Sequence, residues 1–175
     1  DCRIIVGGPD CTKPYSASLL NVSAMSFGSL SKNAVLALNG GAKIGGFAHN
    51  TGEGGISQYH KGPGGDLIWQ VGTGYFGCRN EDGTFSAEKF VANATLDQVK
   101  MIEIKLSQGA KPGHGGILPA SKNTQEIASI RGVQPHTAVH SPPSHSKFSN
   151  AVGLMHFIAE LRQLSGGKPM GFKLC

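Results

Sequence analysis

The stretch 99–116 constrains the fold of this chain most, because an alternating apolar run opens there into a glycine-rich loop. Along 101–106, branched aliphatic side chains fall on one face of an extended strand, while Glu103 and Lys105 fall on the other. An aliphatic face packs well under a helix, whereas a buried face that carries charges needs partners or a ligand. The loop that follows contains four glycines and Lys111, so another group can approach its backbone closely. The stretch therefore predicts a buried strand that delivers cations to a binding site.

The same order, a strand followed by a turn of small residues and a helix, recurs along the chain. Glycine makes up 26 of the 175 residues, about twice the average usage of roughly 7%, and glycines gather where the predicted strands end. Ser29 or Ser31 is expected to cap the first helix and a glycine pair at 40–41 to end it, while Ser86 and Ser149 cap later helices. The predicted strands are 3–6, 19–27, 42–49, 66–72, 101–106 and 168–175, and the predicted helices are 32–39, 87–94, 124–130 and 152–164.

Repeated strand–helix units with glycine loops at the strand ends predict an α/β fold with a parallel sheet, and favour a barrel. A complete (β/α)₈ TIM barrel typically needs about 250 residues, and this chain has 175. We therefore expect a partial, truncated barrel of about five strand–helix units. Residues 1–18 would form an N-terminal segment before the barrel, and residues 19–175 the N-terminal portion of the barrel itself.

The charge of the chain favours a small anionic ligand over nucleic acid. The formal net charge is +5, but no two Lys or Arg residues are adjacent, so no basic patch of the kind that binds nucleic acid is evident. The apolar runs, such as 35–38, are far too short to span a bilayer. We expect a soluble, cytoplasmic protein that binds neither nucleic acid nor membrane.

The cysteines and histidines predict no metal site. The four cysteines lie far apart without a Cys-x-x-Cys pair, so neither a zinc site nor a compact disulfide framework is indicated. His136, His140 and His145 are close enough in sequence to suggest a metal cluster. They lack an accompanying carboxylate or cysteine pattern, and two prolines lie between them, so metal binding is not expected.

Four motifs, in the order in which they occur here, resemble the FMN-binding barrel of the glutamate synthase family. They are Ala-Met-Ser-Phe-Gly at 24–28, Asn-Thr-Gly-Glu-Gly-Gly at 50–55, Ile-Lys with Gln-Gly-Ala-Lys-Pro-Gly within 104–113, and Ser-Pro-Pro at 141–143. The resemblance covers nearly the whole chain. It implies a flavin-dependent oxidoreductase in which ammonia, derived from glutamine elsewhere in the enzyme, adds to 2-oxoglutarate or a related 2-oxo acid. Reduced FMN then delivers a hydride, and glutamate is formed.

The resemblance also implies roles for ten residues of this chain. A 2-oxo acid and the pyrimidine end of a flavin both need cations held away from water, and Lys105 and Lys173 each lie in a strand expected to be buried. The implied catalytic residues are Glu53 and Lys111, the FMN-binding residues are Met25, Ser26, Gln70, Lys105 and Lys173, and the substrate-binding residues are Ser29, Arg79 and Gln108.

Three positions depart from the family pattern. In the large glutamate synthases an arginine precedes the Phe-Gly of the third loop and a glutamine precedes the Leu-Pro after the glycine loop, and both help to hold the substrate carboxylates. Here those positions are Tyr75 and Ile117. His114 replaces the usual acidic residue of the glycine loop. The amine acceptor is therefore left open, including an N-methylglutamate type of synthesis, and Arg79 is the candidate replacement for the missing arginine.

Several parts of the complete enzyme lie outside these 175 residues. The resemblance implies that the remaining half of the barrel, with its phosphate site, and an amidotransferase domain or subunit act as partners. An iron–sulfur cluster is possible, but its ligands are not in this chain. We therefore expect the fragment to be inactive alone. The alternative is a non-catalytic half-barrel that oligomerises through open strand edges, since the strand at 168–175 has no evident partner.

Overall fold

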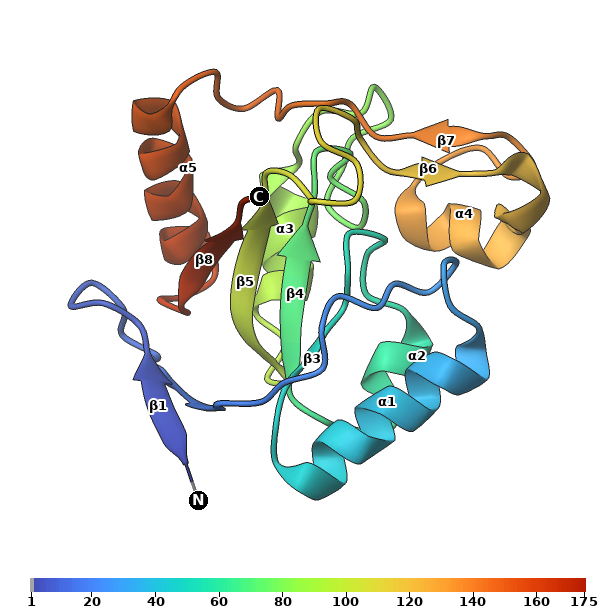
Figure 1. Cartoon of the computed structure of the whole chain (residues 1–175). Coiled ribbons are helices and arrows are strands. Elements are labelled where there is room, and N and C mark those ends of the chain that lie inside the picture. The colour runs from blue at the N-terminus through green and yellow to red at the C-terminus, as the bar shows by residue number, and fades with distance from the viewer. Residues whose placement is uncertain (1) are drawn as a thin grey trace.

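The computed structural model describes residues 2–175 and has a parallel four-stranded sheet at its centre (Figure 1). All three strand pairs in this sheet run parallel, so the loops that leave the strands open at the same edge. The strands, in their order across the sheet, are β3 (His49–Asn50), β4 (Leu67–Val71), β5 (Val99–Lys105) and β8 (Met170–Lys173). The prediction of an α/β fold with a parallel sheet is confirmed.

One face of the sheet carries the main hydrophobic core. Trp69 and Ile104 point from β4 and β5 toward Phe90 and Phe157, and all four side chains are at most 2% exposed. The alternation predicted for 101–106 is thus confirmed, because its aliphatic face packs under helices. These helices are α3 (Ala87–Ala94) and α5 (Ala151–Leu164). The other helices are α1 (Lys32–Gly45), α2 (Gln58–Lys61) and α4 (Gln125–Arg131), with a short 3₁₀ turn at Ala120–Lys122.

Two small antiparallel pairs complete the fold. β1 (Arg3–Val6) pairs with β2 (Tyr15–Ser18), within the segment predicted to precede the barrel. β6 (Ile117–Leu118) pairs with β7 (Val139–His140), and Figure 1 shows this pair beside α4. A second hydrophobic cluster, which contains Phe76, Leu118, Ile127 and Val139, joins the β6–β7 pair and α4 to the loop after β4.

The predicted strands at 19–27 and 42–49 are largely wrong. At 19–27 only two isolated bridges form, Val22 to His49 and Phe27 to Leu30, and the segment is otherwise irregular. Helix α1 does not stop at the glycine pair 40–41 but continues to Gly45, so residues 42–45 are helical and β3 is reduced to two residues. Packing favours the longer helix, because Ala42, beyond the glycine pair, is buried on the same helix as Val35 and Asn39.

The N-terminal caps agree with the predicted ones in α1 and α3 and differ in α5. Ser31 and Ser86 accept the capping hydrogen bonds of α1 and α3, as predicted. Gly46 caps the C-terminal end of α1, and its φ of 65° lies in the left-handed region that glycine adopts most easily. The prediction that Ser149 caps the last helix is wrong, because the side chain of Asn150 accepts the hydrogen bond from Gly153 N–H.

The sheet has four parallel strands rather than the five units expected, and a partial TIM barrel remains a prediction. Among residues 2–175, no helix is long and apolar enough to cross a membrane.

His49 is a buried histidine without hydrogen bonds to the described residues. Its side chain is 0% exposed and neither ring nitrogen has a partner in the part of the chain that the structure describes. Its ring centroid lies 5.2 Å from that of His60. Burial, and secondarily the neighbouring His60, lowers the pKa of His49 from 6.5 to about 4. The folded protein therefore holds His49 neutral under conditions in which the unfolded chain is already protonated.

This difference makes stability depend on pH. Below pH 6.5 the unfolded chain binds a proton that the folded chain does not, so the free energy of unfolding falls as the pH drops from 6.5 toward 4, by up to about 3 kcal/mol. We expect His49→Gln to flatten this acid loss, measured by urea unfolding at several pH values. His156→Gln, which changes an exposed histidine on α5, is the control and should keep the wild-type slope. If the free energy of unfolding depends on pH equally in all three proteins, the attribution of the acid loss to His49 is contradicted.

Candidate functional site

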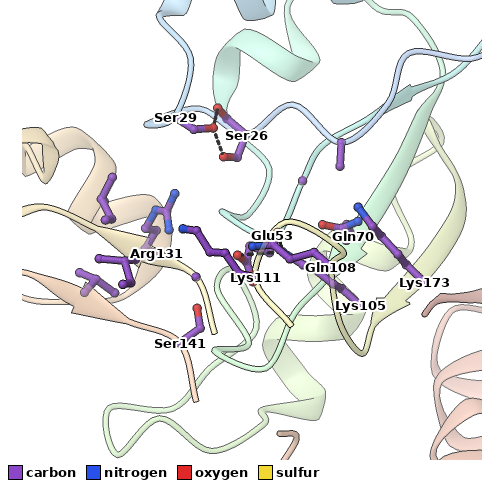
Figure 2. Close-up of a pocket in the computed structure, with 16 residues that line it drawn as sticks. Ser26, Ser29, Glu53, Gln70, Lys105, Gln108, Lys111, Arg131, Ser141 and Lys173 are labelled. Atoms are coloured by element: carbon purple, nitrogen blue, oxygen red, sulfur yellow. Dashed lines mark hydrogen bonds and ion pairs between the residues drawn. The ribbon is translucent and has the colours of Figure 1, made fainter. Parts of the chain in front are cut away.

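A cavity of about 230 Å³ lies at the edge of the sheet where the parallel strands end (Figure 2). It is lined by the loops that follow β3 and β5, by the ends of β4 and β8, and by the β6–β7 pair. The structure brings together here eight of the ten residues singled out in the sequence. They are Ser26, Ser29, Glu53, Gln70, Lys105, Gln108, Lys111 and Lys173.

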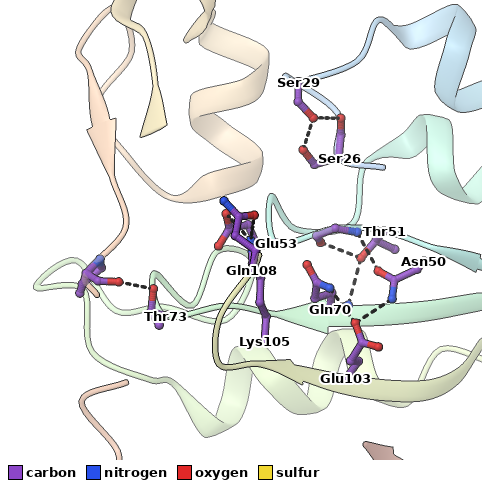
Figure 3. A network of polar contacts seen from close by, with 12 residues as sticks. Ser26, Ser29, Asn50, Thr51, Glu53, Gln70, Thr73, Glu103, Lys105 and Gln108 are labelled. Carbon is purple, nitrogen blue, oxygen red and sulfur yellow. Dashed lines mark hydrogen bonds and ion pairs between the residues drawn. The ribbon is translucent and has the colours of Figure 1, made fainter. Parts of the chain in front are cut away.

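An ion pair between Glu53 and Lys105 lies in this cavity (Figure 3). Lys105 Nζ lies 3.1 Å from Glu53 Oε1 and donates a second hydrogen bond, of 2.9 Å, to Gln108 Oε1. The two charged side chains are 11% and 16% exposed, so their attraction is screened less by water than that of a surface pair. The pair fixes the loop after β3 to the end of β5.

Two glycines hold the Glu53 carboxylate in place. A Cβ atom at Gly72 would lie 2.5 Å from Glu53 Oε2, and one at Gly116 would overlap Glu53 Oε1. A side chain at either position would therefore have to displace the Glu53 carboxylate. The glycine loops that the sequence shows after β4 and β5 make room for this carboxylate.

A second polar group orders the middle of the sheet. Gln70 is 1% exposed and its Nε2 donates a 2.6 Å hydrogen bond to Glu103 Oε1, which also accepts one of 2.9 Å from Asn50 Nδ2 (Figure 3). Gln70 and Glu103 are register partners on β4 and β5. The half-buried Glu103 thus finds two side-chain partners, and Gln70 lines the cavity.

Arg131 also lines the cavity, and sequence reasoning missed it. It is 6% exposed, and no hydrogen bond or ion pair of its guanidinium is found among residues 2–175. Its guanidinium carbon lies 5.0 Å from the centre of the Phe76 ring. Burial lowers the pKa of Arg131, opposed by the charge of Glu53. The residue ends a short helix before Gly132. A solvated cation is common at that position, so its burial could not be predicted from local pattern.

Met25 and Arg79 do not line the cavity. The backbone of Met25 is held by Asn50 and His60, through its N–H and its carbonyl oxygen. Arg79 donates a 3.2 Å hydrogen bond to Gly74 O, and its guanidinium lies 5.5 Å from the Phe76 ring, beside a different cavity. Their predicted contacts with cofactor and substrate stay predictions.

Tyr75, which stands at the first departure from the family pattern, points into the core. It is 1% exposed, and its hydroxyl accepts a hydrogen bond from Lys147 N–H and contacts His145 Nδ1 at 3.1 Å. His145 Nε2 lies 2.8 Å from Lys105 O, so it donates to this carbonyl. In that tautomer Nδ1 accepts from the tyrosine. Burial lowers the pKa of His145 and favours this neutral form. Tyr75 therefore supports the end of β5 and does not enter the cavity.

Comparison with known proteins places this geometry in a family. Residues 11–175 match the family model described as the conserved region in glutamate synthase. The chain belongs to the glutamate synthase family. It is 45% identical over 172 residues to the glutamate synthase large subunit-like protein YerD of Bacillus subtilis, which covers 97% of this chain and 32% of the relative.

Further relatives are named glutamate synthases. The archaeal-type glutamate synthase [NADPH] of Thermotoga sp. strain RQ2 is 35% identical over 153 residues, 87% of this chain and 28% of that protein. The glutamate synthase [NADPH] large chain of Azospirillum brasilense is 34% identical over 156 residues, 86% of this chain and 9% of that protein. The chain thus spans about a third or less of the length of these relatives.

We expect Gly116→Ala to destabilise the protein by displacing the Glu53 carboxylate from its pair with Lys105. Overpacking of this kind costs about 1–3 kcal/mol, which urea unfolding would measure. Gly109→Ala is the matched control in the same loop, because the nearest atom to its added Cβ, in Cys175, is 4.0 Å away. The control should change stability by no more than about 0.5 kcal/mol. Equal unfolding midpoints for the two variants would contradict the inference that Gly116 leaves room for the Glu53 carboxylate.

Proposed function

We propose that the cavity is the flavin-facing part of a 2-oxo acid site in an FMN-dependent glutamate synthase-type oxidoreductase. The observation that carries this proposal is Arg131, a buried guanidinium without an acidic partner among the described residues. Desolvating a cation is costly unless an anion compensates it. A carboxylate ligand supplies that charge. Membership of the glutamate synthase family supports the reaction class.

The side chains at the ends of three neighbouring strands fit the pyrimidine edge of a flavin. Lys105 and Lys173 are register partners on β5 and β8, and Gln70 lies on β4 next to them. Their ammonium groups suit the flavin C2=O and N1, where negative charge develops on reduction, and Gln70 Oε1 suits the flavin N3–H. When bound, FMN supplies the hydride for reductive amination. These three residues would hold and orient it, with Ser26 and Met25 as further proposed contacts.

The remaining residues face the place where the 2-oxo acid and ammonia would meet. Arg131 and Lys111 bind the substrate carboxylate in this proposal. Glu53, which pairs with Lys105, accepts hydrogen bonds from the incoming ammonia. Ser29 and Gln108 contact the substrate. The other half of the barrel, an amidotransferase domain or subunit that releases ammonia from glutamine, and any iron–sulfur ligands belong to the rest of the parent protein.

We expect Arg131→Met, in the intact protein that contains this chain, to raise the KM for the 2-oxo acid about 10- to 100-fold, because hydrogen bonds to charged groups contribute roughly 1.5–3 kcal/mol. Arg162→Met is the matched control. It removes a guanidinium that pairs with Asp10 and does not line the cavity, and should leave KM within about twofold. An intact protein that yields no FMN on extraction would contradict the proposed cofactor, and equal KM changes in the two variants would contradict the carboxylate site.

A second candidate function is a non-catalytic half-barrel that associates through its sheet edge. In the described chain, β8 pairs only with β5, and Phe172 and Leu174 beside its open edge are 53% and 65% exposed. In this case sedimentation of the 175-residue chain would show a dimer or larger species that Phe172→Lys dissociates. A monomer would contradict the second candidate.

A further inference from the structure

We propose that the chain binds a phosphate group in a further cavity, at the edge of the sheet where the parallel strands begin. This cavity has a volume of about 290 Å³, and Lys13, Lys100 and Lys168 line it from three segments that lie far apart in the sequence. Lys100 belongs to the start of β5, whose arrow in Figure 1 points away from this edge. The site is therefore separate from the cavity at the strand ends and does not depend on the function proposed for it.

Lys168 is the buried member of this cluster. Its side chain is 7% exposed, and its Nζ donates hydrogen bonds of 2.6 Å to Ala94 O and 2.7 Å to Leu96 O. Both carbonyls lie at the C-terminal end of α3, where a cation is favourable. An ammonium group has three donors, so one N–H remains after these two bonds. Because Lys168 lines the cavity, we assign this third N–H to the ligand.

Lys13 is held beside the turn that precedes Lys168. Its backbone N–H donates a 3.0 Å hydrogen bond to Gly167 O, and the same carbonyl lies 3.1 Å from Cys11 Sγ. The Lys13 ammonium itself lies over this turn, since a Cβ atom at Gly166 would be 3.3 Å from its Nζ. The N-terminal segment therefore brings a second cation to the cavity that Lys168 lines.

The charges around this cavity do not cancel. Three ammonium groups line it against the single carboxylate of Asp97, and none of the three lysines forms an ion pair within residues 2–175. Burial, and then the charges of Lys13 and Lys100, lower the pKa of Lys168 to about 8, while the charge of Asp97 opposes them. The lysines thus repel one another, and a bound anion would relieve this repulsion.

The kind of donor favours a phosphate over a carboxylate. Ammonium groups act as point charges and lack the planar fork with which a guanidinium holds two carboxylate oxygens. A phosphate group presents three strong acceptor oxygens, so it can accept hydrogen bonds from ammonium groups that arrive from three segments. Pro14 and Val99 also line the cavity, and the organic part of a phosphate monoester can pack against them. The site therefore suits inorganic phosphate or a phosphate monoester.

Calorimetric titration of the intact protein that contains this chain tests the site, with inorganic phosphate and phenyl phosphate as separate probes. We expect the wild type to bind at least one probe. Lys13→Gln combined with Lys100→Gln should raise its dissociation constant about tenfold or more, because two charged donors are lost. Lys13 is exposed and Lys100 half-buried, and neither ammonium group donates a hydrogen bond within residues 2–175, so these changes should not disturb folding.

Lys43→Gln combined with Lys61→Gln is the matched control. It removes the same charge from exposed positions on α1 and α2 outside this cavity, and should leave the dissociation constant within about twofold. Tighter binding of phenyl phosphate assigns the site to a monoester, and equal or weaker binding assigns it to free phosphate. A wild type that binds neither probe, or a dissociation constant that the first pair of changes raises no more than the control pair, overturns the proposal.

Discussion

The ion pair between Glu53 and Lys105 is the interaction on which the rest of the site depends. It joins the loop after β3 to the end of β5 across β4, and it places one carboxylate beneath the open side of the cavity. The Glu53 side chain fits there because Gly72 and Gly116 leave room on both sides of its carboxylate. The ion pair therefore depends both on the strands that carry its two residues and on the glycines beside Glu53.

Around this pair the cavity carries more positive than negative charge. Three lysines and Arg131 line it, against the single carboxylate of Glu53. Arg131 is the decisive member, since its burial lowers its pKa, opposed only by the charge of Glu53, and no acid among the described residues forms an ion pair with it. An anionic ligand resolves this imbalance. The family to which the chain belongs, together with the strand-end positions of Gln70, Lys105 and Lys173, explains why we propose a flavin and a 2-oxo acid as the molecules that occupy the site.

The sequence predicted those parts of the fold that local pattern controls. The alternation in β5 and the apolar run of β4 specify which faces are buried, so the core and the polar face were predictable. The extent of α1 was not, because packing of Ala42 outweighs two helix-breaking glycines. Eight residues singled out through motifs that resemble the family line one cavity, and several of them lie where the parallel strands end. Arg131 escaped prediction because its burial arises only when α4 meets Phe76, which lies far away in the sequence.

The most direct test of this account is a crystal structure of the intact protein with a 2-oxo acid bound. We predict that the carboxylate lies within hydrogen-bond distance of the Arg131 guanidinium, with Glu53 still paired to Lys105. A carboxylate bound elsewhere, or an acidic side chain from another part of the protein seated on Arg131, would contradict the central claim that this buried arginine is the anchor for an anionic substrate.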